Sequence, residues 1–137
     1  LPGGGREGLS EVDVIGLDFG KKIAYLCEVT THLHGLGYVD YPTTMRKLQD
    51  KFKHDKEYAD KVLKDFPTRL HMLWSPVVPK RKLTEQLAEL EEKGIELIIN
   101  RKYAERIEEL RNMARKMKED TGNPAFRLLQ ILGHIRE

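Results

Sequence analysis

Apolar and polar positions divide the chain into four strand-like and four helix-like segments. Between residues 11 and 32, apolar residues alternate with polar ones in two runs joined by Phe19-Gly-Lys-Lys, which is typical of a β-hairpin. Two later runs, 69–78 and 95–100, are apolar on both faces, as covered strands are. Helical spacing occurs in four segments: 43–66, 83–93, 102–119 and 125–135. We therefore expect an α/β fold in the order ββαβαβαα, with one mixed sheet and helices on both of its faces.

The predicted hairpin carries acids on strands that are otherwise apolar, and burying an unpaired carboxylate is costly. A two-residue turn at positions 20–21 places Asp13 opposite Glu28, and Glu11 opposite Thr30. Opposed side chains lie on the same side of a sheet with Cβ atoms roughly 5 Å apart. That separation suits two carboxylates that share one hard divalent cation. We therefore expect a metal site at Asp13 and Glu28, with Glu11 either a further ligand or an exposed acid at the strand end.

Composition fits a globular protein with no membrane segment. The chain has 137 residues, of which 39% are hydrophobic, and no apolar run approaches the roughly 20 residues of a membrane helix. A single cysteine, Cys27, excludes an internal disulfide, fits the reducing cytoplasm and is expected in the core. We expect a flexible segment at 1–8 and one domain at 9–137, with a core at about 11–100 and a helical extension at 101–137. Because the chain begins at Leu1 rather than Met, we expect it to be part of a longer protein.

Charge is unevenly distributed along the chain. Residues 1–40 carry three Lys or Arg against six Asp or Glu, and residues 41–82 carry eleven against five. An acidic site beside a basic stretch suits a metal-dependent enzyme that acts on a polyanion, although a basic stretch is also typical of a solvated helix face. The candidates for phosphate contact are Lys47, Lys51, Arg69, Lys80, Arg81 and Lys82.

Histidines offer a weaker alternative. His32 and His34, with Asp40 or His54, have a spacing that can bind zinc, but a third clear ligand is missing. His71 lies in the middle of a predicted strand and is expected to pack in or near the core.

The segment from Glu11 to about Asn100 resembles the PD-(D/E)xK nuclease superfamily, whose fold is that of the restriction endonucleases. Asp13 matches the Asp of the motif, and Glu28-Val29-Thr30 matches Glu-x-Lys with Thr in place of Lys. The strand, helix and strand that follow have the order found in that family.

The resemblance implies an endonuclease that hydrolyses DNA phosphodiester bonds with Mg²⁺ or Mn²⁺, as the catalytic domain of a larger restriction, repair or mobile-element protein. Asp13 and Glu28 would hold the ion, and the carbonyl of Val29 would add a ligand. Thr30 occupies the place of the family's lysine and cannot act as a base. Lys47 or Lys51, one turn apart on the following helix, is our preferred substitute because relatives with a migrated lysine are known.

Two functions from different classes remain open. The first is the DNA endonuclease, which the three acids on one face favour. The second is a catalytically decayed module that binds nucleic acid or a protein partner, which Thr30 favours. The apolar last helix, together with the use of two sites by many relatives, makes a homodimer an expectation.

Overall fold

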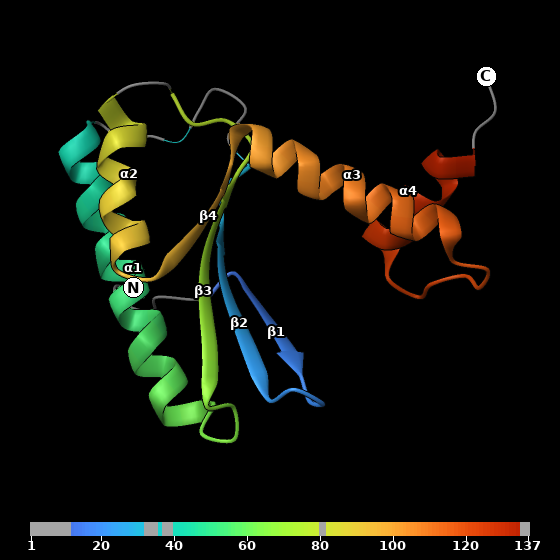
Figure 1. Cartoon of the computed structure of the whole chain (residues 1–137), viewed down its shortest axis with the longest axis horizontal. Helices are drawn as coiled ribbons and strands as arrows, with labels where there is room; N and C mark the ends of the chain where they lie inside the picture. The colour runs from blue at the N-terminus through green and yellow to red at the C-terminus, as the bar shows by residue number, and fades with distance from the viewer. Residues whose placement is uncertain (1–11, 32–35, 37–39, 80–81, 135–137) are drawn as a thin grey trace, which may run out of the picture. The chain divides into compact units, whose positions relative to one another are not determined.

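A computed structural model describes residues 12–31, 36, 40–79 and 82–134 (Figure 1). The element order is ββαβαβαα, as the sequence predicts. The elements are β1 (Val14–Asp18), β2 (Ile23–Val29), α1 (Tyr41–Val62), β3 (Thr68–Ser75), α2 (Lys82–Glu92), β4 (Ile95–Ile99), α3 (Asn100–Lys116) and α4 (Pro124–His134). The chain packs as two compact units, which meet in the sequence between Ile99 and Asn100. The predicted flexible segment at 1–8 lies outside the described residues.

The first unit contains a four-stranded mixed sheet in the order β1-β2-β3-β4. β1 pairs antiparallel with β2, whereas β2, β3 and β4 run parallel to one another. Val14 pairs with Cys27, which is the predicted register and sets the next residues, Asp13 and Glu28, opposite each other, so the predicted hairpin register is confirmed.

The predicted two-residue turn is wrong. The strands stop at Asp18 and resume at Ile23, so the turn has four residues, and Lys22 takes the left-handed conformation with φ of 56°. The Asp18 carboxylate accepts a hydrogen bond from the backbone N–H of Lys21 and closes this turn. The register is unchanged because both turns are centred on the same point of the chain.

Both helices of the first unit cover the same face of the sheet, whereas we expected helices on both faces (Figure 1). Ala24 and Leu26 of β2 pack with Ala59 of α1, next to Leu63 and Phe66. A larger cluster joins Leu73 of β3 and alternate residues of β4 to both helices; its members include Leu48, Phe52, Leu73, Leu83, Leu87, Leu90, Ile95 and Leu97. This face therefore holds the core and also the polar groups described below.

α1 begins two residues before the predicted start because its cap is Asp40 rather than Thr43 or Thr44. The Asp40 carboxylate accepts a hydrogen bond from the Thr43 N–H at 2.7 Å, as N-cap acids do. Thr44 is buried instead, and its hydroxyl donates to the Asp40 carbonyl.

The second unit is a pair of helices. The Arg115 guanidinium donates to the Gly133 carbonyl at 3.0 Å and links α3 to α4. Asn123 caps α4 through its side-chain oxygen, and Pro124 occupies the first helical position. α4 exposes Leu128, Ile131 and Leu132, each by at least 46% of its surface, in line with the apolar character predicted for it.

Candidate functional site

Glu28 is the centre of the candidate site. It lies next to the last residue of β2, on the face that α1 covers, and only 2% of it is exposed. The Lys51 ammonium of α1 forms an ion pair with its Oε2 atom. Its Oε1 atom is buried and has no hydrogen-bond partner among the described residues. A buried carboxylate that is only half satisfied is costly, which marks the position as a candidate for function.

Asp13 joins this pair from the residue before β1. Its Oδ2 atom lies 3.8 Å from the Lys51 Nζ atom and accepts a hydrogen bond of 2.8 Å from the Val29 N–H. The structure thus brings together the two acids that the hairpin register placed opposite each other. One ammonium group lies against both carboxylates.

Asp55 is a fourth member that sequence reasoning missed. It follows Lys51 by one turn of α1 and is completely buried, and neither of its carboxylate oxygens has a hydrogen-bond partner among the described residues. A signal for it exists, because Leu48, Phe52, Asp55 and Ala59 form one buried stripe of the helix, where an acid is unusual.

Burial changes the acidity of both enclosed carboxyls. Desolvation raises the pKa of Glu28 to about 7, although the hydrogen bond and the charge of Lys51 act in the opposite direction. Desolvation likewise raises the pKa of Asp55 to about 6, again against the charge of Lys51. The negative charges of Asp13 and Asp55 add to the rise at Glu28. Glu28 and Asp55 therefore take up protons as the pH falls from neutral, and carboxyl pKa values shifted in this way are typical of functional sites.

Two other residues predicted for catalysis, Thr30 and Lys47, lie two residues after Glu28 and one helical turn before Lys51. The Thr30 N–H donates to the Trp74 carbonyl at 2.9 Å, which extends the β2–β3 pairing by one step. The Thr30 hydroxyl oxygen is buried without a hydrogen-bond partner among the described residues. Lys47 lies one turn before Lys51 on α1 with an exposed side chain.

Arg69 is held by internal contacts. Its guanidinium pairs with Asp60 and donates at 3.1 Å to the carbonyls of Leu63 and Phe66, which follow the end of α1. Among the other predicted contacts to nucleic acid, Lys80 and Arg81 lie outside the described residues, as does the side chain of Lys82, the first residue of α2.

The other candidates divide into those outside the described residues and those within them. Glu11, His32 and His34 lie outside the described residues, and so does any zinc site built on the two histidines. His71 is buried with 8% exposure, as predicted. Cys27 is only partly buried, and that burial raises the pKa of its thiol.

The acids present fit a two-carboxylate magnesium site. Within the described ranges, no group of three His, Cys, Asp or Glu side chains is placed to hold a metal ion. Magnesium does not require one, because it commonly binds through one or two carboxylates and keeps several waters or substrate phosphates. Asp13 and Glu28 already lie on either side of one cationic group, and Glu28 has an unpaired oxygen.

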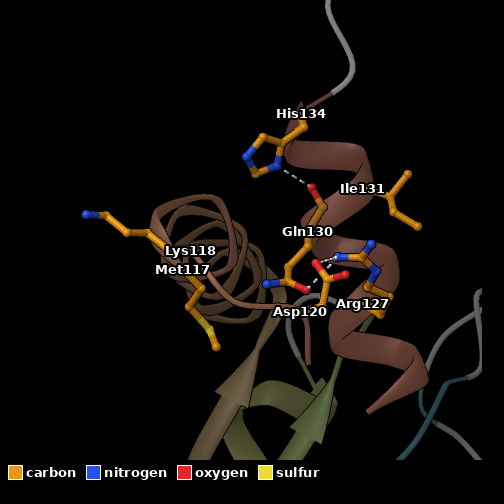
Figure 2. A pocket seen from close by; sticks show the side chains of 7 residues that line it. All are labelled: Met117, Lys118, Asp120, Arg127, Gln130, Ile131 and His134. Carbon is orange, nitrogen blue, oxygen red and sulfur yellow. Dashed lines mark hydrogen bonds and ion pairs between the residues drawn. The ribbon is translucent and has the colours of Figure 1, made fainter. Parts of the chain in front are cut away.

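The second unit contains a cavity of about 430 Å³ that is lined by the connection after α3 and by α4 (Figure 2). Gln130 is buried there, and its amide donates to the Glu119 carbonyl at 2.9 Å and accepts from the Thr121 N–H. Arg127 pairs with Asp120 in the same wall. These bonds hold the connection between the two helices in place, so the polar groups of this cavity have a structural explanation.

Comparisons of the chain with protein-family models, with curated proteins and with solved structures found no match. None of the helices in the described part of the chain is long and apolar enough to cross a membrane.

Proposed function

We propose that the first unit is a divalent-metal-dependent endonuclease domain that hydrolyses DNA phosphodiester bonds. The observation that carries this proposal is the buried Glu28 carboxylate, which pairs with the half-buried Lys51 ammonium, with Asp13 near the same ammonium. Such a cluster lowers stability unless every charge is satisfied, and here one oxygen of Glu28 is not. The restriction-endonuclease-like fold, the PD-(D/E)xK membership and the homodimer are parts of the same proposal.

In this proposal, Asp13 and Glu28 hold Mg²⁺ or Mn²⁺ and Lys51 replaces the lysine that Thr30 lacks. A bound divalent ion lowers the pKa of a coordinated water and offsets negative charge on the phosphate. Lys51 adds a positive charge beside both acids, from which it can orient the attacking water or a phosphate oxygen. Asp55, one helical turn on, provides an unpaired carboxylate next to this lysine.

A decayed module that binds nucleic acid is the second candidate, and one observation favours it. The Lys51 ammonium already pairs with Glu28, so the acids have a counter-charge without a metal. Binding without cleavage would then rest on the basic residues of α1.

Plasmid cleavage tests the endonuclease. Supercoiled, single-stranded and branched DNA are incubated with Mg²⁺ or Mn²⁺ and the wild type, Asp13→Asn, Glu28→Gln or Lys51→Gln. We expect each variant to cleave at least about 100-fold more slowly, as loss of one group in such a site commonly costs. Asp50→Asn and Lys61→Gln remove the same charges from exposed positions of α1 and should cleave as the wild type does.

Binding separates the two candidates. If the wild type cleaves none of the substrates faster than the Asp13 and Glu28 variants do, but still binds DNA, the endonuclease is excluded and the module is supported. A thermal shift with Mn²⁺ that disappears in Glu28→Gln would show the metal site without relying on cleavage.

A further inference from the structure

The first unit has a polar cavity of its own, on the same face of the sheet as Glu28 and near the start of the parallel strands β3 and β4. Its volume is about 380 Å³. Three segments form it: the C-terminal half of α1, the first residues of β3 and the turn between α2 and β4. The lining residues are Lys56, Ala59, Asp60, Arg69, His71, Lys93 and Gly94. None of these residues belongs to the Asp13–Glu28–Lys51 cluster.

The charges around this cavity are unbalanced. Asp60, the one acid among the described residues that line it, already forms an ion pair with Arg69. Lys56 and Lys93 are exposed, and neither makes an ion pair with a described residue. Two positive charges at the cavity therefore lack a negative counterpart among the described residues.

A buried imidazole nitrogen without a partner in the described part of the chain lies in the same lining. His71 is 8% exposed, and its Nδ1 atom has no hydrogen-bond partner among the described residues. Burial first, and then the charges of Lys56 and Arg69, lower the pKa of His71, so the imidazole is neutral at pH 7 and carries one N–H donor. A buried polar atom without a partner is costly, and in the tautomer with its hydrogen on Nδ1 a bound phosphate oxygen would remove that cost by accepting from it.

The cavity has room for a ligand larger than a single ion. Gly94 has φ of 81°, and a Cβ atom added to it would meet nothing within 4 Å. An adjoining cavity of about 330 Å³ shares Lys56, Asp60 and Lys93 and continues along α1 to Lys53, where Glu57 is a second acid.

We propose that the cavity at His71 binds a phosphate dianion, either free or as the terminal monoester of a larger molecule, between the Lys56 and Lys93 ammonium groups and the His71 imidazole. A phosphate monoester carries about −1.5 to −2 charge at pH 7, which matches the two unpaired lysines, whereas a diester carries only one. Charge-assisted hydrogen bonds from ammonium groups to phosphate oxygens are among the stronger ones in proteins. This inference goes beyond the proposed nuclease and does not depend on it.

The imidazole resonances of His71 report binding directly in the full chain. At constant ionic strength, we expect inorganic phosphate and methyl phosphate to shift these resonances with a Kd of about 1 mM or tighter, and dimethyl phosphate to bind at least about tenfold more weakly. Lys56→Gln and Lys93→Gln should each weaken phosphate binding about fivefold or more. Lys61→Gln removes the same charge from an exposed position of α1 outside the cavity and should leave the Kd unchanged.

A second arm separates the two sources of the phosphate group. A short oligonucleotide with a 5′-phosphate that shifts His71 when its 5′-hydroxyl counterpart does not would identify a terminal phosphate as a ligand. A shift with inorganic phosphate alone would assign the cavity to free phosphate. The proposal is overturned if phosphate up to about 50 mM leaves His71 unmoved, or if Lys61→Gln weakens binding as much as the cavity variants do.

Discussion

Two regions of the sheet face that α1 covers differ in whether their charged groups are buried or exposed. At the Glu28 end, the carboxyls of Glu28 and Asp55 are buried and their pKa values are raised, and one lysine pairs with Glu28 and lies near the more exposed Asp13. At the His71 end, Lys56 and Lys93 are exposed and make no ion pair with a described residue, and the buried titratable group of the cavity lining, His71, has a lowered pKa. The difference shows that burying charge is not a requirement of this sheet. The buried carboxyls of the first region lower the stability of the protein, and the fold does not require them, which favours a functional role.

The sharpest test of this contrast is removal of the cation from the acidic region. Lys51→Met leaves Glu28 buried without its partner, and we expect the free energy of unfolding to fall by about 2–4 kcal/mol, somewhat less than for a fully buried ion pair because 35% of the Lys51 side chain is exposed. Urea denaturation at pH 7 measures the change. Lys61→Met, on the exposed side of the same helix, should stay within about 0.5 kcal/mol of the wild type. Equal effects in the two variants would show that Glu28 is not held by Lys51.

The pH dependence of stability tests the second acid of this region. A carboxyl whose pKa is raised on folding binds its proton more tightly in the folded state. It therefore contributes full stability below about pH 4, the unfolded pKa, and loses it as the pH rises. For Asp55 the loss is complete above its folded pKa of about 6, and for Glu28 above about 7.

Asp55→Asn should remove the Asp55 share of this loss. We expect its free energy of unfolding, relative to the wild type, to rise by about 2 kcal/mol between pH 4.5 and pH 7.5, as measured by urea denaturation at both values. Asp50→Asn, at an exposed position of the same helix, should follow the wild type at both pH values. A difference that stays constant with pH would contradict the raised pKa of Asp55.

The sequence predicts the acidic region far better than the basic one. The opposition of Asp13 and Glu28 follows from the two-residue period of strands and the position of one turn, which are local properties of residues 13–28. It holds even though the turn type is wrong, because the register depends only on the centre of the turn. Lys51 was one of two lysines on a helix expected nearby, and the contacts place it against both acids.

The rest depends on tertiary arrangement. Asp55 lies on an apolar helix stripe, where sequence alone does not show whether an acid is buried or lies at the margin of the stripe. The phosphate cavity joins side chains from α1, β3 and the turn after α2, which meet only once the sheet is covered. Helices on both faces were expected because β3 and β4 are apolar on both sides, but within the first unit both helices pack on one.

Arg69 also lines the His71 cavity, but unlike Lys56 and Lys93 its side chain is held by contacts within the described part of the chain. Its planar guanidinium reaches Asp60 and the carbonyls of Leu63 and Phe66 at once, which a lysine ammonium cannot do. Asp60 is 74% exposed, so the ion pair itself contributes little, and the two carbonyl bonds account for most of the effect. We expect Arg69→Lys to lower the free energy of unfolding by about 1–2 kcal/mol, less than Lys51→Met, in urea denaturation at pH 7.

Lys56→Gln is the matched control, because Lys56 lines the same cavity without an ion pair to a described residue. It should change stability by no more than about 0.5 kcal/mol. Since Arg69→Lys keeps the charge, it should retain most of the phosphate affinity that Lys56→Gln loses. The opposite result would be a loss of stability in Lys56→Gln and a loss of phosphate binding in Arg69→Lys. Arg69 would then be the ligand-binding residue and Lys56 the structural one. The contrast with the acidic region would then disappear, because both regions would use their paired cations for function.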